Sequence, residues 1–487
     1  MNDFCTIRVN FKGGIISPGE LQQILEIVKG FHVRHIKFGL RQQLFIHLPY
    51  ALLAGIEKKF KKHHIAYQID SNFYPNLVSS YVAEEVFQKG NWLSEGIYKD
   101  IFDQFDYEPK LKINISDNEQ SFSPFFSGHI NFIASRIPNF WHLAVRKPKS
   151  NTVLDYDKLI YTHEVARVCQ QIEENIGSYE EENQDFSQIF SHLDVSISND
   201  VEEGLSLPHF SLPYYEGFNR YGKKTWLGIY RRNESYAVDF LLEVCELCLN
   251  TRVGEICLTP WKSLIIKNIE ENDRSKWSAV LAKYDINVRH AANELNWQVE
   301  DDSEEGLSLK NRIVNYFNQN DLRTFGLCFG VKIMPRTEVF ASIMVQKRSL
   351  KLFGLIPLIP VYDLSFTEDF DPNGRTKKYF ATGVLSINLE EQVRRMVLKY
   401  NHAVAENNIK KANLKPTLKE KPEHVIEKVH QCPTCYTIYD PAFGDELNVI
   451  PVGVPFKKLP ADYCCPVCET TKEKFKPIKN LTHYEKI

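Results

Sequence analysis

The chain has 487 residues, 43% hydrophobic and 25% charged, which is typical of soluble globular protein and long enough for several domains with their own cores. Its formal net charge of -3 excludes the strongly basic surface that nucleic-acid and membrane-surface partners require. No apolar run approaches a membrane span and strand-like sequence starts at Phe4, so we expect a cytoplasmic protein whose 11 cysteines are metal ligands or reduced thiols.

Residues 4–66 alternate between strand-like and helix-like patterns. An alternating run over residues 6–11 predicts a strand, and an amphipathic segment predicts a helix over 18–31. A second alternating run predicts a strand over 36–48, followed by a helix over 52–64. This order is that of a βαβ-type unit with a second helix.

The same order of elements returns later in the chain. We predict a strand over 225–230, a helix over 236–250, a strand over 255–266 and a helix over 275–284. Two copies of one supersecondary unit indicate an internal duplication.

Motifs in both copies carry a resemblance to a known family. The first copy contains Gly13–Ser17 and Leu40–His47, and the second contains Gly254–Leu264. Between them lies the lysine-bearing strand Pro109–Ser116. In this order the motifs resemble those of sulfite and nitrite reductases, whose body contains two ferredoxin-like half-domains. The resemblance implies the same α+β fold here.

The resemblance also implies a cofactor and residues to hold it. In that family siroheme lies between the halves beside a [4Fe-4S] cluster, and basic side chains bind the siroheme carboxylates and the substrate oxyanion. Carried over to this chain, Arg41 faces siroheme or substrate, and Lys110 and Lys112 face the anion. The alternative is that these three residues are relics, exposed to solvent or paired with local carboxylates.

The cluster ligands of the family are missing from this sequence. Family enzymes hold the cluster with a C-x5-C and a C-x3-C after the second half-domain, but residues 287–401 contain one cysteine, Cys328. One thiolate cannot hold a four-iron cluster, so we expect no [4Fe-4S] cluster, and siroheme is retained only as an alternative.

Two other patterns favour structural roles. Cys245 and Cys248 lie on one face of a predicted helix, where small hydrophobic side chains pack well, so we interpret them as buried thiols rather than a second metal site. The acidic runs 180–182 and 300–305 are interpreted as solvated loops, with a docking face for a basic partner as the alternative.

The last part of the chain predicts a metal site. Two C-x-x-C pairs contribute Cys432, Cys435, Cys465 and Cys468, and this separation suits four thiolates around one iron or zinc ion. Cys464 has the wrong spacing to Cys468 and is interpreted as a bystander. The aromatic residues Tyr439, Phe456, Tyr463 and Phe475 lie where a very small fold must bury them around its metal.

These cysteines and aromatic residues resemble rubredoxin along nearly the whole segment. The resemblance implies one iron that cycles between Fe2+ and Fe3+, while structural zinc remains the alternative. Rubredoxins usually have glycine after each cysteine pair, where the chain turns tightly. This chain has Tyr436 and Glu469 there, which costs about 1 kcal/mol each if the positions need positive φ.

The predicted organisation is therefore a duplicated reductase-like body with a small metal domain. The expected domains are residues 1–75 (first ferredoxin-like half-domain), 76–205 (α/β domain), 206–290 (second half-domain), 291–402 (α/β domain without cluster cysteines), 403–429 (charged linker) and 430–480 (rubredoxin-like domain).

The predicted function is one-electron transfer, serving nitrite, nitrate or sulfite assimilation. The expected partners are redox proteins, such as a nitrite or sulfite reductase or a reductase that supplies electrons. Two alternatives stay open: a siroheme enzyme of the nitrite/sulfite reductase type that is fed by its own rubredoxin domain, and a zinc-stabilised assembly or regulatory factor.

Overall fold

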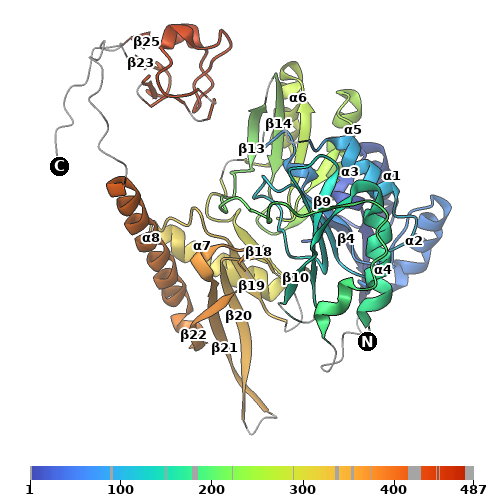
Figure 1. Ribbon diagram of the computed structural model, residues 1–487. Coiled ribbons are helices and arrows are strands. Elements are labelled where there is room, and N and C mark those ends of the chain that lie inside the picture. The colour runs from blue at the N-terminus through green and yellow to red at the C-terminus, as the bar shows by residue number, and fades with distance from the viewer. Residues whose placement is uncertain are drawn as a thin grey trace. The chain divides into compact units, whose positions relative to one another are not determined.

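The computed structural model describes residues 3–87, 92–148, 150, 152–177, 185–221, 223–288, 290–334, 339–352, 356–374, 376–414, 429–441, 443–445, 447–448 and 450–477. The chain divides into two compact units, Met1–Ala403 and Val404–Ile487. We call the first the body and the second the C-terminal unit, and each is described by itself (Figure 1).

The first predicted copy forms a five-stranded sheet with the order β15-β3-β4-β1-β5. Its strands are β1 (Phe4–Asn10), β3 (His35–Phe38), β4 (Gln43–Pro49), β5 (Gln68–Ile69) and β15 (Ser235–Ala237). Helices α1 (Pro18–Gly30) and α2 (Tyr50–Lys62) accompany it. Ser17 caps α1 by accepting the backbone N–H of Glu20 at 3.2 Å, so the helix starts at the predicted position.

The second copy repeats this arrangement in a sheet with the order β13-β14-β17-β16-β2. The strands of this sheet are β2 (Ile15–Ile16), β13 (Gly217–Tyr221), β14 (Lys224–Ile229), β16 (Ile256–Leu258) and β17 (Leu264–Ile269). The helices are α5 (Val238–Asn250) and α6 (Arg274–Lys283). The strand and helix order of the first copy therefore recurs, as the duplicated fold requires.

The two copies interlock by exchanging a strand. Strand β15 of the second copy pairs with β3 of the first, and β2 of the first pairs with β16 of the second. Helices α1 and α5 pack against each other, and one hydrophobic cluster contains core residues of both copies. The copies therefore share one core, and the domain boundaries predicted inside the body remain predictions.

The strands predicted over 36–48 and 255–266 are each two strands, so this part of the prediction was wrong. A tight turn separates β3 from β4, where Gln42 has a φ of 58° and donates its N–H to the Gly39 carbonyl at 3.0 Å. The equivalent turn between β16 and β17 has Lys262 with a φ of 54°, donating to Thr259 at 3.2 Å. Gly39 and Pro260 are turn signals in the sequence, and the prediction of one continuous strand over each run overlooked them.

A seven-stranded sheet follows the first copy in the chain. Its order is β12-β11-β9-β8-β7-β6, with β10 paired to β9. The strands are β6 (Val78–Ser79), β7 (Ile113–Ser116), β8 (Ile130–Ala134), β9 (Phe140–Arg146), β10 (Val153–Asp155), β11 (Lys158–Tyr161) and β12 (Ser198–Asp200). Strands β6, β7 and β8 are parallel, and helices α3 (Glu95–Asp103) and α4 (Val165–Ile176) accompany this sheet.

The last sheet of the body has the order β18-β19-β20-β21-β22. Its strands are β18 (Trp297–Val299), β19 (Phe329–Lys332), β20 (Ile343–Leu352), β21 (Ile356–Thr367) and β22 (Lys377–Leu385), and β20 and β21 form the long hairpin in Figure 1. Helices α7 (Glu304–Gln319) and α8 (Leu389–Leu414) share a hydrophobic cluster with the sheet. Helix α8 includes the start of the predicted linker, and residues 415–428 lie outside the described part of the chain.

The C-terminal unit contains a small antiparallel sheet with the order β24-β23-β25. The strands are β23 (His430–Gln431), β24 (Ile438–Tyr439) and β25 (Lys476–Pro477). Tyr439, Tyr463 and Phe475 are buried with two of the four predicted cysteine ligands, and Phe456 packs against them. The predicted aromatic core around the metal is therefore confirmed.

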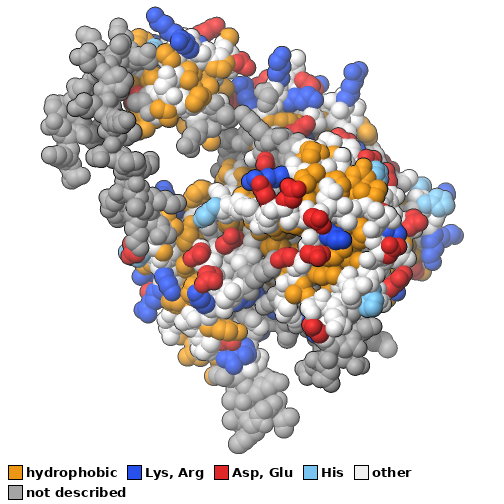
Figure 2. Space-filling view, in the orientation of Figure 1, with side chains coloured by type: hydrophobic (Ala, Val, Ile, Leu, Met, Phe, Trp, Pro, Cys, Tyr) orange, Lys and Arg blue, Asp and Glu red, His pale blue; other side chains and the backbone are white. Residues whose placement is uncertain are grey.

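The surface carries charges of both signs. On the face of the body in Figure 2, acidic and basic side chains are interspersed, in keeping with the net charge of -3. Of the helices that the structure describes, none combines the length and the apolar character needed to cross a membrane.

The acidic run 300–305 was predicted as a solvated loop, and this was wrong for Glu300 and in part for Asp301, whereas Asp302, Glu304 and Glu305 are exposed. Glu300 is 2% exposed and accepts the Met334 N–H at 2.9 Å. Asp301 accepts the Leu40 N–H at 3.0 Å, and Asp302 lies 2.9 Å from the His47 ring nitrogen Nε2. The run pairs with groups that are distant in sequence, which its local composition cannot show. The run 180–182 lies outside the described residues.

Lys262 is the cation at the centre of this buried charge network. Its ammonium group is 2.7 Å from a Glu234 carboxylate oxygen and 3.5 Å from Asp301, and it donates to the Glu300 carbonyl at 3.0 Å. Burial lowers the pKa of Lys262, but the two carboxylates outweigh burial and raise it above its ordinary value. Lys262 thus stays charged and links the second copy to the acidic run.

The substitution Lys262→Ala leaves two largely buried carboxylates without their cation. We expect the free energy of unfolding of the body to fall by about 3–5 kcal/mol, because an uncompensated buried charge is costly. All 6 tryptophans lie in the body, so tryptophan fluorescence in a denaturant titration reports its unfolding.

The matched control is Lys29→Ala. Lys29 pairs with Asp239 at 2.7 Å, but both side chains are more than half exposed (58% and 63%). An exposed pair of this kind contributes at most about 1 kcal/mol. Equal losses in the two variants would contradict the role assigned to Lys262.

Candidate metal centre

The four predicted cysteine ligands come together in the C-terminal unit. The sulfur atoms of Cys432, Cys435, Cys465 and Cys468 all lie within 4.8 Å of one another. The Cys432 and Cys468 sulfurs are 3.4 Å apart, as are those of Cys435 and Cys465. A tetrahedron with metal–sulfur bonds of about 2.3 Å has edges of roughly 3.8 Å, so the donor set fits one tetrahedral iron or zinc ion.

Two matching turns position these sulfurs. In the first, Tyr436 donates its N–H to the Cys432 carbonyl at 3.0 Å, and in the second Glu469 donates to Cys465 at 2.9 Å. Tyr436 has a φ of 63° and Glu469 a φ of 59°. The left-handed conformation expected at these two positions is therefore present, although neither residue is glycine.

Two threonines that sequence reasoning missed lie against the ligands. The Thr437 hydroxyl oxygen is 3.1 Å from the Cys435 sulfur, and the Thr470 hydroxyl oxygen is 3.1 Å from the Cys468 sulfur. Both belong to a repeated C-P-x-C-x-T pattern, which is the sequence signal that could have identified them.

Hydrogen bonds to sulfur favour the thiolate form. The hydroxyl and the N–H of Thr437 lower the pKa of Cys435. Burial raises the pKa of Cys432, but backbone N–H groups of the first turn and the Thr470 hydroxyl outweigh burial and lower it to about 6. Burial, in contrast, raises the pKa of Cys465 to about 12. Thiolates are the metal-binding form of cysteine, so the contacts at Cys432 and Cys435 favour cation binding, and the buried Cys465 loses its proton when the cation binds.

Cys464 is not part of the sulfur cluster, in agreement with the predicted register. It is buried beside Cys465, but the group of sulfurs within 4.8 Å includes Cys465 and not Cys464. Its carbonyl accepts the side-chain amide of Asn448 at 3.1 Å, which joins this segment to the loop before it.

In the body, Arg41 is buried and bonded to protein acceptors. Its guanidinium donates to the Asn76 carbonyl at 3.1 and 2.7 Å, to the Ile113 carbonyl at 2.9 Å and to the Asn114 side-chain oxygen at 3.3 Å. The Asn76 amide in turn donates to the Arg41 carbonyl at 2.9 Å. Arg41 therefore holds the β3–β4 turn against strands of the next sheet.

The two predicted lysines differ in their surroundings. Lys110 is exposed, with its ammonium group 5.6 Å from the centre of the Phe73 ring. Lys112 is half-buried, and its backbone N–H donates to a ring nitrogen of His129 at 3.2 Å.

The other buried cations of the described residues also have protein acceptors. Lys267 donates to the Tyr81 and Glu84 carbonyls at 2.8 and 3.1 Å, and Arg146 donates to the Gly128 carbonyl at 3.1 Å. Lys310 donates to the Tyr230 hydroxyl at 2.6 Å, and burial lowers its pKa to about 8.

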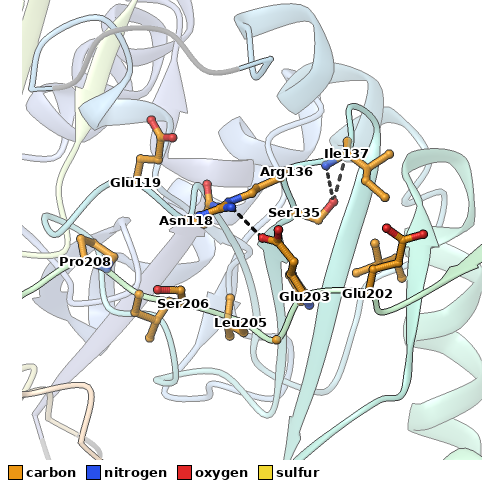
Figure 3. Close-up of a pocket in the computed structure, with 14 residues that line it drawn as sticks. Asn118, Glu119, Ser135, Arg136, Ile137, Glu202, Glu203, Leu205, Ser206 and Pro208 are labelled. Atoms are coloured by element: carbon orange, nitrogen blue, oxygen red, sulfur yellow. Dashed lines mark hydrogen bonds and ion pairs between the residues drawn. The ribbon is translucent and has the colours of Figure 1, made fainter.

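A cavity of about 420 Å³ lies where the parallel strands β7 and β8 end (Figure 3). Arg136 and Glu203 form an ion pair across it at 2.6 Å. A neighbouring cavity of about 390 Å³ shares His142 with it. Neither cavity is lined by Arg41, Lys110 or Lys112, and the first has more carboxylates than cations, which disfavours an anionic ligand there.

Cysteines of the body are scattered through its core. Cys245 and Cys248 are buried on α5, and burial raises the pKa of Cys245 to about 12, as expected for structural thiols. Cys328 is buried and bonds to the Phe340 carbonyl. Among the described residues, the cysteines of the C-terminal unit form the one group of three or more that could hold a metal ion.

Comparison with known proteins identifies the C-terminal unit. The rubredoxin family profile matches residues 429–475. The probable rubredoxin HupI of Bradyrhizobium diazoefficiens is 44% identical over 50 residues, which are 10% of this chain and 72% of that protein. The high molecular weight rubredoxin of Moorella thermoacetica is 28% identical over 155 residues, which are 31% of this chain and 66% of that protein.

The body is similar to a solved structure. The structure of the Mycobacterium tuberculosis NirA protein matches with a TM-score of 0.61 and 14% identity, over 81% of this chain and 80% of that chain. At this identity the likeness concerns the fold alone. It confirms the sulfite/nitrite reductase-like fold that was predicted for the body.

The ligand register can be tested with two neighbouring substitutions. We expect Cys464→Ser to keep one metal per chain, because its sulfur lies outside the cluster, and Cys465→Ser to lose most of it. Metal content after purification under identical conditions measures both. Retention by Cys465→Ser together with loss by Cys464→Ser would reverse the register.

The left-handed turns give a second prediction for this site. Tyr436→Gly removes a β-carbon from a residue with a φ of 63°, so we expect the bound metal to resist denaturant-induced release by about 1 kcal/mol more. The exposed turn residue Val467, which has no positive φ, provides the control Val467→Gly. If both variants resisted metal release to the same greater extent, the result would contradict the backbone strain assigned to Tyr436.

Proposed function

Because the chain belongs to the rubredoxin family through its C-terminal residues, we propose that it is a one-electron transfer protein. The observation that carries this proposal is the set of four sulfurs within 4.8 Å in the unit that matches the family. Cys432, Cys435, Cys465 and Cys468 would hold one iron, which would supply one-electron chemistry between Fe3+ and Fe2+ forms.

The protein's own residues hold the four ligands in place. The two turns fix the positions of the thiolates, so little rearrangement would accompany a change of charge on a bound iron. Cys435 and Cys468 are only partly buried, whereas Cys432 and Cys465 are fully buried. A partner protein could approach these two partly exposed sulfurs, which would be the shortest route for an electron to and from a bound iron.

We further propose that the body does not hold siroheme. A tetrapyrrole with several carboxylates needs cations that are free to bind them. The guanidinium of Arg41 instead donates hydrogen bonds to Asn76, Ile113 and Asn114. The other buried cations of the described residues have protein acceptors too. Replacing these bonds with siroheme contacts would leave buried carbonyl oxygens unsatisfied.

The body then has a role other than catalysis by siroheme. We propose that its reductase-like fold serves recognition of a redox partner, and that the pathway is nitrite, nitrate or sulfite assimilation. The partners are a reductase that supplies electrons and a nitrite or sulfite reductase that receives them, and the protein acts in the cytoplasm.

The test is metal analysis with absorption spectra on protein made in cells that are supplied with siroheme. We expect one iron per chain, visible thiolate-to-iron bands that bleach on reduction and return on oxidation, and no tetrapyrrole bands. Zinc in place of iron would overturn the electron-transfer proposal. Tetrapyrrole bands together with turnover of nitrite or sulfite would make the protein an enzyme.

A further inference from the structure

We propose that Thr437 and Thr470 raise the reduction potential of the iron centre by donating hydroxyl hydrogen bonds to its two partly exposed sulfurs. The inference rests on the proposed function, because it requires iron in the four-cysteine site. It goes further in assigning a tuning role to two residues that are not metal ligands.

The two threonines occupy equivalent places in the two turns. After each second cysteine, a residue with positive φ (Tyr436 or Glu469) reverses the chain. The next carbonyl, of Thr437 or Thr470, then accepts the N–H of Cys432 or Cys465 at 2.8 Å. This return of the chain brings each threonine hydroxyl to 3.1 Å from the sulfur of Cys435 or Cys468.

The direction of these hydrogen bonds follows from metal binding. A cysteine sulfur bound to iron has lost its proton and can only accept, so the threonine must be the donor. Iron with four thiolates carries one more negative charge in the ferrous form than in the ferric form. A donor aimed at sulfur therefore stabilises the ferrous form more, which raises the potential.

The two hydroxyls are not equivalent in their other contacts. The Thr470 oxygen also lies 2.9 Å from the hydroxyl oxygen of Thr434, which belongs to the first cysteine pair. The single Thr470 proton is therefore divided between a sulfur and Thr434. Among the described residues, the Thr437 hydroxyl bonds to the Cys435 sulfur alone. Thr434 itself provides a control, since its removal leaves the Thr470 proton to the sulfur.

The experiment is voltammetry of the full iron-loaded chain with single and double Thr→Val variants, which keep side-chain shape and remove the hydroxyl. We expect Thr437→Val to lower the ferrous-to-ferric ratio at fixed potential about threefold, which is about 28 mV for one electron, and Thr470→Val to lower it by less, because Thr434 shares the Thr470 proton. The double variant should show the product of the two effects. The visible bands should shift as well, with iron content unchanged.

Two further variants separate hydrogen bonding from packing. Thr437→Ser keeps the hydroxyl and should keep the potential near that of the original protein, whereas Thr434→Val should leave the potential unchanged or raise it. A fall in potential in Thr434→Val equal to that in Thr470→Val would overturn the inference, because it would indicate a general effect of the substitution.

The outcomes distinguish this inference from the proposed function. A reversible one-electron wave that does not move in the Thr437→Val and Thr470→Val variants would overturn the tuning role and leave the electron carrier intact. The absence of any wave in the original protein, with zinc bound, would overturn both.

Discussion

Burying a charge requires a compensating group, and both units of this protein are organised around that constraint. In the body, buried cations and buried carboxylates are both present, and each cation is compensated by carboxylates, carbonyl oxygens or a hydroxyl. Lys262 lies among Glu234, Asp301 and the Glu300 carbonyl, and so ties the second copy of the repeat to the start of α7. Arg41 ties the first copy to strands of the next sheet in the same way.

In the C-terminal unit the groups that need compensation are the thiolates of four cysteines. Four thiolates lie within 4.8 Å of one another, and without a cation and hydrogen-bond donors they would repel strongly. Backbone N–H groups of the two turns supply part of the compensation, and the hydroxyls of Thr437 and Thr470 supply more. The turns need a left-handed residue to aim these groups, which explains why Tyr436 and Glu469 adopt positive φ at a cost.

Sequence reasoning succeeded where the decisive contacts are local. The spacing of each C-x-x-C pair and the aromatic residues near the pairs define the metal unit, and helix α1 begins at the predicted residue, Pro18. Reasoning failed where the partner is distant: the sequence alone does not show that Lys262 lies beside Asp301, or that Glu300 is buried and accepts the Met334 N–H. The acceptors of the Arg41 guanidinium come from residues 76, 113 and 114. The motif Leu40–His47 alone could therefore not reveal that its N–H groups bond to protein acceptors. The threonines are not ligands, so the cysteine spacing that reveals the site does not reveal them.

Proteins with the fold of the body and proteins with the fold of the C-terminal unit transfer different numbers of electrons. A sulfite or nitrite reductase passes six electrons to its substrate, and it does so with cofactors that accumulate charge next to the reacting atom. Four thiolates would hold one iron, and one iron would transfer one electron at each encounter with a partner. The buried arginines and lysines of the body already have protein acceptors. These residues therefore do not offer cations to a cofactor that accumulates negative charge. Under the proposed electron-transfer function, the chemistry of a multi-electron reduction would belong to a partner, and the reductase-like fold of the body would serve to recognise it.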